Sequence, residues 1–223
     1  MAELYLVRHA QAAFGTDDYD RLTELGHRQA RWLGEYFAQR AMAFDRVLTG
    51  NLRRHRETLQ GIAETCAGVP AAEVEAGLDE YRAETLVAAY ARAMGVAYSA
   101  GHSDRRSHFR LLREVLYAWA DGALAAEDHL PFGDFVARAR AALEIARRPG
   151  ASRVLIVSSG GPISALLGTV LGVAPRMMID LNLQARNSGV SELRFNERAT
   201  HCVSFNNVPH LEQAGRSGAI TYS

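Results

Sequence analysis

The sequence predicts an α/β fold with a mostly parallel central sheet in a three-layer α/β/α arrangement. A helical insertion is expected over the carboxyl ends of the strands. Three observations favour this fold. Near-continuous apolar runs over residues 3–7 and 153–157 are typical of strands buried on both faces of a parallel sheet. Segments with helical spacing follow the early strands, as in βαβ units. From about residue 81 to 148 this rhythm gives way to a mostly helical stretch.

The chain begins with a strand over residues 3–7 and a loop over residues 10–21 that carries Gly15 and three aspartates. Thr23 is a residue type that caps helix N-termini well. Apolar residues then recur at helical spacing: Leu25, Ala30, Leu33 and Phe37. The first helix is therefore expected to begin directly after Thr23.

A second strand and helix follow the same pattern. Residues 44–49 are predicted to form the strand, which ends before Gly50 and Asn51. One helix face then carries apolar side chains at helical spacing: Leu52, Leu59, Ile62, Ala63 and Cys66. Residues 69–70, Val-Pro, end this helix, and residues 72–76 predict a weak third strand.

The helical stretch at about residues 81–148 carries two apolar stripes. The first consists of Phe109, Leu112, Leu116 and Trp119. The second consists of Phe135, Ala139, Ala142, Leu143 and Ala146. Residues 101–104 are expected to form a loop between helices. We expect the stretch to be a cap inserted into a single domain of residues 1–223.

The clearest strand of the chain, residues 153–157, opens its last part. A serine- and glycine-rich turn over residues 158–162 follows, and then a helix with an apolar face: Ile163, Leu166, Leu167 and Val170. Residues 190–195 and 200–205 alternate like strands, and the short link over residues 196–198 fits a hairpin.

Composition excludes several classes of function. Lys and Arg number 25, as do Asp and Glu, so the formal net charge is zero and no general basic field recruits nucleic acid or acidic membranes. The two cysteines, Cys66 and Cys202, are too few for a disulfide framework and lie in no metal-ligand spacing. Neither a signal sequence nor a membrane span is evident. We expect a cytoplasmic protein that binds neither nucleic acid nor membranes, and its oligomeric state is undetermined.

Three predicted strand ends carry groups suited to an anion. Arg8 and His9 follow the first strand; the planar arginine fork suits phosphate, and histidine can attack or relay protons near neutral pH. Arg54 lies near the first turn of the second helix, and Ser159 and Gly160 precede another helix N-terminus. Ligands of open parallel sheets bind outside the carboxyl ends of the strands, so we expect one phosphate site there.

Five segments resemble family motifs in the right order. They are Leu6-Val7-Arg8-His9-Ala10, Leu22-Thr23-Glu24-Leu25-Gly26-His27-Arg28-Gln29-Ala30, Leu52-Arg53-Arg54-His55-Arg56-Glu57-Thr58, Leu78-Asp79-Glu80 and Val154 to Gly161. Together they are similar to the motifs of the histidine phosphatase superfamily, also called the phosphoglycerate mutase-like family. The resemblance covers most of the chain.

The resemblance implies a phosphomonoester hydrolase that acts on a small phosphorylated metabolite without a metal or cofactor. His9 would attack phosphorus and form a phosphohistidine, which water then hydrolyses. Glu80 would protonate the leaving oxygen and afterwards act as the base. Arg8 and Arg54 would bind the phosphoryl oxygens and lower the pKa of His9.

One position departs from the family. Its last motif usually reads Ser-His-Gly-Gly, and that histidine also grips the phosphoryl group; here the position is Ser159. A serine hydroxyl donates one neutral hydrogen bond, but it supplies neither the charge nor the reach of an imidazolium. By analogy with oxyanion holes, loss of one donor costs about 10²–10³ in rate. A slow phosphatase, a rearranged site and a non-catalytic binder therefore all stay open.

Three other functions compete with the phosphatase. A phosphoglycerate mutase-like phosphotransferase is disfavoured because residues 11–15 read Gln-Ala-Ala-Phe-Gly rather than the Glu-Ser-x-Trp-Asn of cofactor-dependent mutases. A catalytically weak phospho-ligand binding or regulatory protein is favoured by Ser159 and opposed by the retained His9 and Glu80. A serine hydrolase using Ser158 or Ser159 lacks the G-x-S-x-G pattern. The sequence does not identify the substrate.

Other residues have ordinary explanations beside functional ones. Helical spacing directs Arg53, Arg54 and Arg56 differently, so at most two of them can face the pocket. Surface or packing roles are expected for His55, His102, His108, His129, His201 and His210; one of His55, His201 and His210 is hypothesised to replace the missing imidazole in part.

Asn187-Ser188 resembles a family segment that supports the pocket. A basic stretch, Arg105, Arg106, Arg110 and Arg113, reads as a solvated helix face that could hold an anionic substrate tail.

Overall fold

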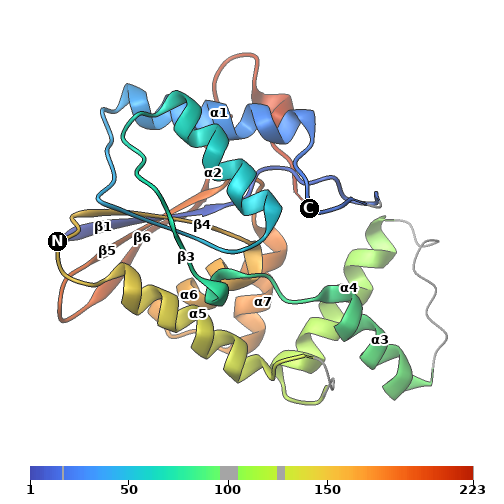
Figure 1. Ribbon diagram of the computed structural model, residues 1–223. Helices are drawn as coiled ribbons and strands as arrows, with labels where there is room; N and C mark the ends of the chain where they lie inside the picture. Colours follow the sequence, from blue (N-terminus) through green and yellow to red (C-terminus); the bar gives the residue numbers. More distant parts are fainter. Residues whose placement is uncertain (17, 96–104, 125–128, 223) are drawn as a thin grey trace.

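The structure is a computed structural model that describes residues 1–16, 18–95, 105–124 and 129–222 (Figure 1). In this part of the chain, six strands form one sheet in the order β3-β2-β4-β1-β5-β6. Their bounds are β1 Ala2–Arg8, β2 Arg46–Thr49, β3 Glu73–Val74, β4 Arg153–Ser158, β5 Val190–Phe195 and β6 Thr200–Asn207. The predicted strands are therefore present, although β3 is shorter than expected.

The central strand β1 lies between a parallel and an antiparallel neighbour. Leu6 is paired with Ile156 of β4 in a parallel ladder and with Ser191 of β5 in an antiparallel one. β2, β3 and β4 run parallel to one another, and only the strand pairs of the β5–β6 edge are antiparallel. The prediction of a mostly parallel sheet is confirmed, and the hairpin expected at residues 196–198 joins β5 to the edge strand β6.

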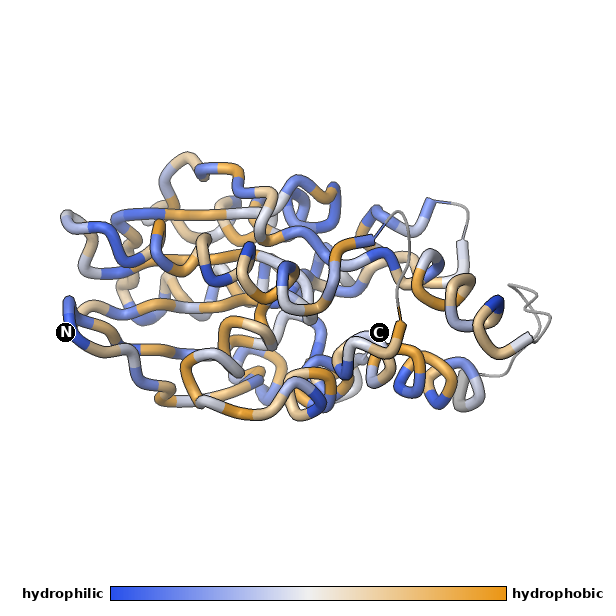
Figure 2. The backbone as a smooth tube through the Cα atoms, turned by 90° about the horizontal axis from the view of Figure 1, so that it is seen from below, coloured by the Kyte–Doolittle hydropathy of each residue, from blue (hydrophilic) through white to orange (hydrophobic). Residues whose placement is uncertain are grey.

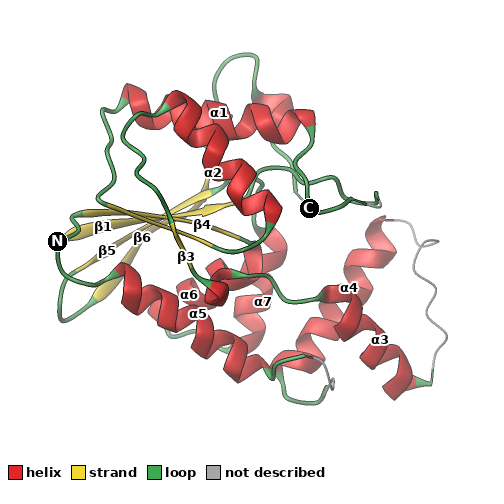
Figure 3. Cartoon of the chain, viewed as in Figure 1, coloured by secondary structure: helices red, strands yellow, loops and turns green. Residues whose placement is uncertain are grey.

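Helices cover both faces of this sheet, which makes the fold three-layered (Figure 3). On one face lie α1 (Glu24–Gln39) and α2 (Arg53–Thr65); on the other lie α5 (Phe132–Ala146), α6 (Gly160–Leu171) and α7 (Pro175–Gln184). β1 serves both layers, because Leu4 and Leu6 belong to the core under α5 and α6 whereas Val7 belongs to the core under α1 and α2. Apolar residues recur along the strands (Figure 2).

The helices of the predicted insertion lie in two different parts of the structure. Helices α3 (Ala83–Met94) and α4 (Arg105–Ala120) project beyond the carboxyl ends of the strands, whereas α5 packs against α6 under the sheet (Figure 1). Both predicted stripes face the interior: Leu112, Leu116 and Trp119 in α4, and Phe135 and Ala139 in α5, are buried. The loop expected at residues 101–104 lies outside the described residues.

Local signals account for the helix ends. Thr23 caps α1 as predicted, since its hydroxyl accepts a hydrogen bond of 3.0 Å from the backbone N–H of Gly26. Pro175 occupies the first turn of α7, where its missing N–H is harmless. Short 3₁₀ turns, η1 (Ala76–Leu78) and η2 (Ser217–Ala219), precede Glu80 and the C-terminus. None of the described helices is both long and apolar enough to cross a membrane.

Candidate active site

The carboxyl ends of three adjacent strands bring the predicted site residues together. β4 lies between β2 and β1 in the sheet, so the segments that follow these strands meet at one edge. His9 follows β1, Arg54 lies in the first turn of α2 after β2, and Ser159 is the N-cap of α6 after β4. This is the convergence that the sequence predicts for a phosphate site.

His9 is held as a neutral imidazole with one nitrogen available. Its side chain is 2% exposed, and its Nδ1 lies 2.8 Å from the carbonyl oxygen of Ala10. That contact requires Nδ1 to carry the proton, which leaves the lone pair on Nε2. Burial, and then the positive charges of Arg54 and Arg8, hold the pKa of His9 well below its ordinary value. The ring is therefore in the state that a nucleophile requires.

Two buried arginines flank His9. Arg8 donates from Nη1 to the carbonyl oxygen of Ala185, whereas its Nε finds no partner among the described groups. Arg54 donates to Asp20 Oδ1 at 2.8 Å, and its guanidinium lies over the Tyr19 ring at 5.1 Å. Its Nε likewise finds no partner among the groups described. Buried N–H groups without partners are rare, and here they are suited to phosphoryl oxygens.

Helical geometry selects Arg54 from the three arginines at the start of α2. Arg53 and Arg56 are exposed, and Arg53 is paired with Glu57 at 2.6 Å and with Asp18 at 3.1 Å. Arg54 is buried. The expectation that the three would point in different directions is met.

Glu80 faces the same site from the segment after η1. Its carboxylate accepts hydrogen bonds of 3.2 Å from the backbone N–H groups of Gly161 and Tyr81. Burial raises the pKa of Glu80, while the charge of Arg54 and the bond from Gly161 oppose that rise. A carboxyl that protonates more readily than usual suits a proton donor.

Ser159 has as its neighbour His55, one of the three histidines that the sequence offers as partial replacements for the missing imidazole. Its hydroxyl oxygen lies 2.7 Å from His55 Nε2 and 3.5 Å from Arg54 Nη2, and both Ser159 and His55 are fully buried. Although Ser159 is the N-cap of α6, it makes no capping hydrogen bond. Such a bond typically contributes about 1 kcal/mol to stability, so the hydroxyl is diverted from a favourable local role.

Glycine at position 160 is explained by crowding. A Cβ there would lie 2.3 Å from Asn182 Oδ1 and 3.6 Å from Arg8 Nε, so a larger residue would intrude between α7 and the arginine. Gly160 therefore allows the N-terminus of α6 to come close to Arg8.

The other two candidate histidines lie elsewhere. His201 is exposed on β6. His210 is fully buried with its Nε2 2.8 Å from Ser188 Oγ, and burial lowers its pKa to about 3. Ser188 in turn donates from its backbone N–H to the carbonyl oxygen of His9, so the segment resembling the family's support motif does contact the His9 loop. Of the three histidines, the structure places His55 beside Ser159 and Arg54.

Residues of two matched motifs hold the segment after His9. Thr58 Oγ1 accepts from the Ala10 N–H at 3.0 Å and donates to the Arg54 carbonyl oxygen at 2.7 Å. Gln29 Oε1 accepts from the Gln11 N–H at 2.8 Å. These bonds tie the His9 loop to α1 and α2, which explains threonine and glutamine at these spacings.

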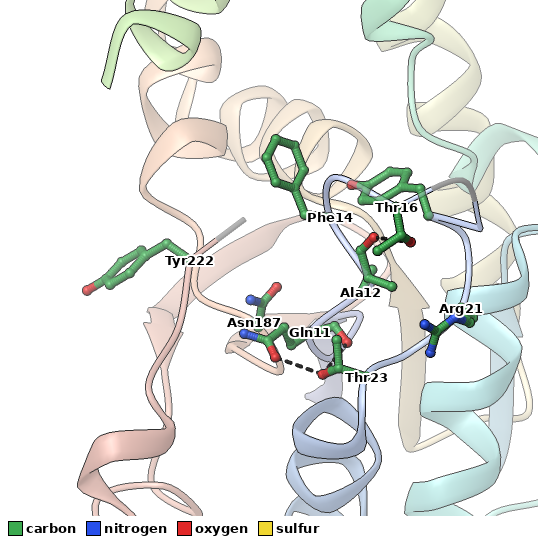
Figure 4. A pocket seen from close by; sticks show the side chains of 10 residues that line it. Gln11, Ala12, Phe14, Thr16, Arg21, Thr23, Asn187 and Tyr222 are labelled. Atoms are coloured by element: carbon green, nitrogen blue, oxygen red, sulfur yellow. Dashed lines mark hydrogen bonds between the residues drawn. The ribbon is translucent and has the colours of Figure 1, made fainter. Parts of the chain in front are cut away.

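A cavity of about 340 Å³ opens beside this loop (Figure 4). It is lined by Gln11, Ala12, Ala13, Phe14, Thr16, Tyr19, Arg21, Thr23, Asn187 and Tyr222. Tyr19 links it to the site because the same ring packs on Arg54. Phe14 links it to the cap because its ring lies 5.6 Å from that of His108 in α4. The cavity is therefore next to the side chains that the sequence predicts to bind phosphate.

Nowhere in the described part of the chain do three His, Cys, Asp or Glu side chains gather in a way that could hold a metal ion. The arginines of the basic stretch whose side chains are described, Arg110 and Arg113, are exposed on α4.

Comparison with known proteins decides the family. Residues 4–208 match the family model described as histidine phosphatase superfamily (branch 1). The chain belongs to this superfamily. Its sequence is 26% identical over 209 residues to the probable phosphoglycerate mutase GpmB of Klebsiella pneumoniae, covering 88% of this chain and 86% of that one.

Solved structures share the superfamily fold. A phosphoserine phosphatase mutant from Entamoeba histolytica in complex with phosphoserine superposes with a TM-score of 0.67 at 20% identity, covering 95% of this chain and all of that one. The α-ribazole phosphatase of Shigella flexneri gives a TM-score of 0.64 at 19% identity over 92% of this chain and 96% of its own. The curated relative is named as a mutase, and these two structures are named as phosphatases.

Proposed function

We propose that the protein hydrolyses phosphomonoesters of small metabolites through a phosphohistidine formed on His9, without a metal. The observation that carries this proposal is the neutral His9 ring, whose Nδ1 is engaged by the Ala10 carbonyl oxygen and whose pKa is lowered by burial and by the charges of Arg54 and Arg8. Both arginines are buried, and their Nε groups have no partner in the described part of the chain. The lowered pKa of His9 and the raised pKa of Glu80 are the directions that a nucleophile and a proton donor need.

The proposed reaction has two steps. His9 Nε2 forms a bond to phosphorus while the ester P–O bond breaks, and Glu80 gives its proton to the leaving oxygen. Water then attacks phosphorus as Glu80 takes a proton from it, the N–P bond breaks, and neutral His9 and inorganic phosphate result. Arg8 and Arg54 offset the charge on the phosphoryl oxygens throughout, with Ser159 and Gly160 at the α6 N-terminus completing the cage.

A mutase is the second candidate, because the curated relatives bear that name. Phosphatase chemistry is preferred because the loop over residues 11–15 lacks the mutase pattern and instead borders an open cavity. A serine hydrolase is disfavoured: the Ser158 hydroxyl is engaged with the Leu78 carbonyl oxygen at 2.6 Å, and burial lowers the pKa of His55, the histidine nearest Ser159, to about 3. Such an imidazole is a poor general base.

The test is a panel of aryl phosphates, phosphoamino acids and phosphoglycerates, with phosphate release and isomerisation both measured. We expect the wild-type protein to release phosphate and His9→Ala to release none. Isomerisation without release would identify a mutase. Phosphate binding without turnover on the whole panel would identify a binding protein.

A further inference from the structure

The hydroxyl of Ser159 is engaged by a different helix from the one that it begins. Instead of capping α6, it meets His55 Nε2 of α2 at 2.7 Å, with Arg54 Nη2 at 3.5 Å. The His55 ring itself lies 5.9 Å from the ring of His9, centroid to centroid. The pair therefore forms one wall of the site in which His9 reacts.

The second nitrogen of His55 shows which way the hydrogen bond runs. His55 Nδ1 is buried and has no partner among the described groups. It faces Gly50, and the nearby Asp79 carboxylate is engaged by the backbone N–H and side-chain amide of Asn51. A proton on Nδ1 would be an orphaned buried donor, which is costlier than an unpaired lone pair. The proton therefore belongs on Nε2, and His55 donates to Ser159 Oγ.

This direction leaves the Ser159 hydroxyl hydrogen without a protein acceptor in the described part of the chain. Both groups that contact its oxygen, His55 Nε2 and Arg54 Nη2, are donors. A hydroxyl that accepts twice must turn its own hydrogen elsewhere. The hydrogen is then available to an oxygen of a ligand bound by Arg54, whose Nη2 contacts the same hydroxyl.

We propose that His55 is a positioning residue that donates to Ser159 Oγ and thereby aims the Ser159 hydroxyl at the phosphoryl group bound beside His9. The proposal rests on the proposed function. It differs from simple replacement of a missing imidazole, because the histidine acts through the serine and supplies a direction rather than a charge. Burial, reinforced by Arg54 and Arg56, lowers the pKa of His55 to about 3 and so keeps the ring neutral.

The test compares His55→Ala, His55→Gln, Ser159→Ala and the double variant His55→Ala/Ser159→Ala. Glutamine keeps an N–H donor at about the reach of Nε2. We expect His55→Ala and Ser159→Ala each to lower kcat about 100-fold, the scale of one lost donor. The double variant should be no slower than either single one, since the two residues act as a unit. His55→Gln should stay within about fivefold of wild type, with the smaller change in KM.

His210→Ala is the matched control. His210 is an equally buried histidine whose Nε2 lies 2.8 Å from a serine hydroxyl, Ser188 Oγ, and whose Nδ1 is also unpartnered among the described groups. Its loss should lower the melting temperature as much as His55→Ala does, but change kcat by no more than about threefold. If His55→Ala does not fold, the proposal is still tested by the other two variants: His55→Gln should stay close to wild type in kcat, and Ser159→Ala should be about 100-fold slower.

Three results would overturn the proposal: full activity in His55→Ala, multiplied losses in the double variant, or His55→Gln as slow as His55→Ala. If wild type hydrolyses nothing on the panel, the proposed function fails separately. Calorimetric binding of inorganic phosphate to the same variants then tests the pair: equal weakening in His55→Ala and Ser159→Ala supports it, and unchanged affinity refutes it.

Discussion

Gly161→Ala is expected to disable Glu80 without touching any group that holds the phosphoryl. A Cβ at this position would lie 2.1 Å from Glu80 Oε1 and 2.9 Å from the Tyr81 ring. The ring cannot swing away easily, because it packs on Trp119 and Phe135 and its hydroxyl accepts from Asn182 at 2.9 Å. The carboxylate must move instead, by about 1.3 Å, to reach the 3.4 Å at which contacts become ordinary.

A misplacement of about 1 Å typically costs about 10²-fold in rate. We therefore expect kcat/KM to fall about 100-fold on alkyl phosphates, whose leaving oxygen needs a proton. On an aryl phosphate with an acidic phenol, the loss in kcat/KM should be at most about tenfold, because kcat/KM reports phosphoryl transfer to His9 and not the later hydrolysis of the phosphohistidine. Steady-state kinetics on both substrates measure this difference.

Gly168→Ala is the control on the same helix. A Cβ there would lie 2.3 Å from Met178 Cγ, so it overpacks α6 against α7 away from Glu80. It should destabilise the fold by about 1–3 kcal/mol but leave kcat within about twofold. Equal losses of kcat/KM on alkyl and aryl phosphates in Gly161→Ala, or a comparable loss in Gly168→Ala, would refute the role of Glu80 as proton donor.

Substitutions at the buried residues Arg54, Ser159 and His210 should have measurable effects. Arg54→Ala should lower kcat/KM by about 10²–10³, whereas the exposed Arg53→Ala should change it by about twofold or less; similar losses in both would contradict the assignment of Arg54 to the phosphate. Ser159→His alone should lose activity because His55 occupies the space, and His55→Ala/Ser159→His should recover more activity than either single variant; a fully active Ser159→His would show that the space is free. The pKa of His210 is about 3 in the folded state against 6.5 ordinarily, so its contribution to stability is complete above about pH 6.5 and is lost as the pH falls. Between pH 7.5 and 5.5, the free energy of unfolding measured by denaturant titration should fall by about 1.4 kcal/mol less in His210→Gln than in wild type. Identical decreases would show that this histidine is not buried in its neutral form.

The sheet could be predicted from the sequence because its strands carry unmistakable patterns. The runs at residues 3–7 and 153–157 are apolar on both faces, and the structure buries them between two helical layers. α7 was not predicted, since its pattern is weak and the single signal was Pro175 at a first turn. The packing partner of α5 could not be predicted from the sequence either. Its apolar stripe predicts a buried face but does not say whether that face meets the cap or the sheet.

The candidate site was also only partly predictable from the sequence. The convergence of His9, Arg54 and Ser159 was predictable because each follows a strand, and the carboxyl ends of parallel strands lie at one edge of the sheet. The contact between His55 and Ser159 was not, because it depends on how α2 approaches the N-terminus of α6. No spacing along the chain encodes the distance between residues 104 positions apart.

The most direct test of the central claim is to trap the phosphoenzyme. The protein is mixed with a labelled phosphomonoester, quenched within one turnover, digested and examined by mass spectrometry for an acid-labile, alkali-stable phosphoryl group. The mechanism predicts that group on His9 in wild type, its absence in His9→Ala, and its accumulation when Glu80 is replaced by Gln and an aryl phosphate is the donor. Phosphate release without any phosphoryl group on His9, or with the group on Ser159, would contradict the mechanism.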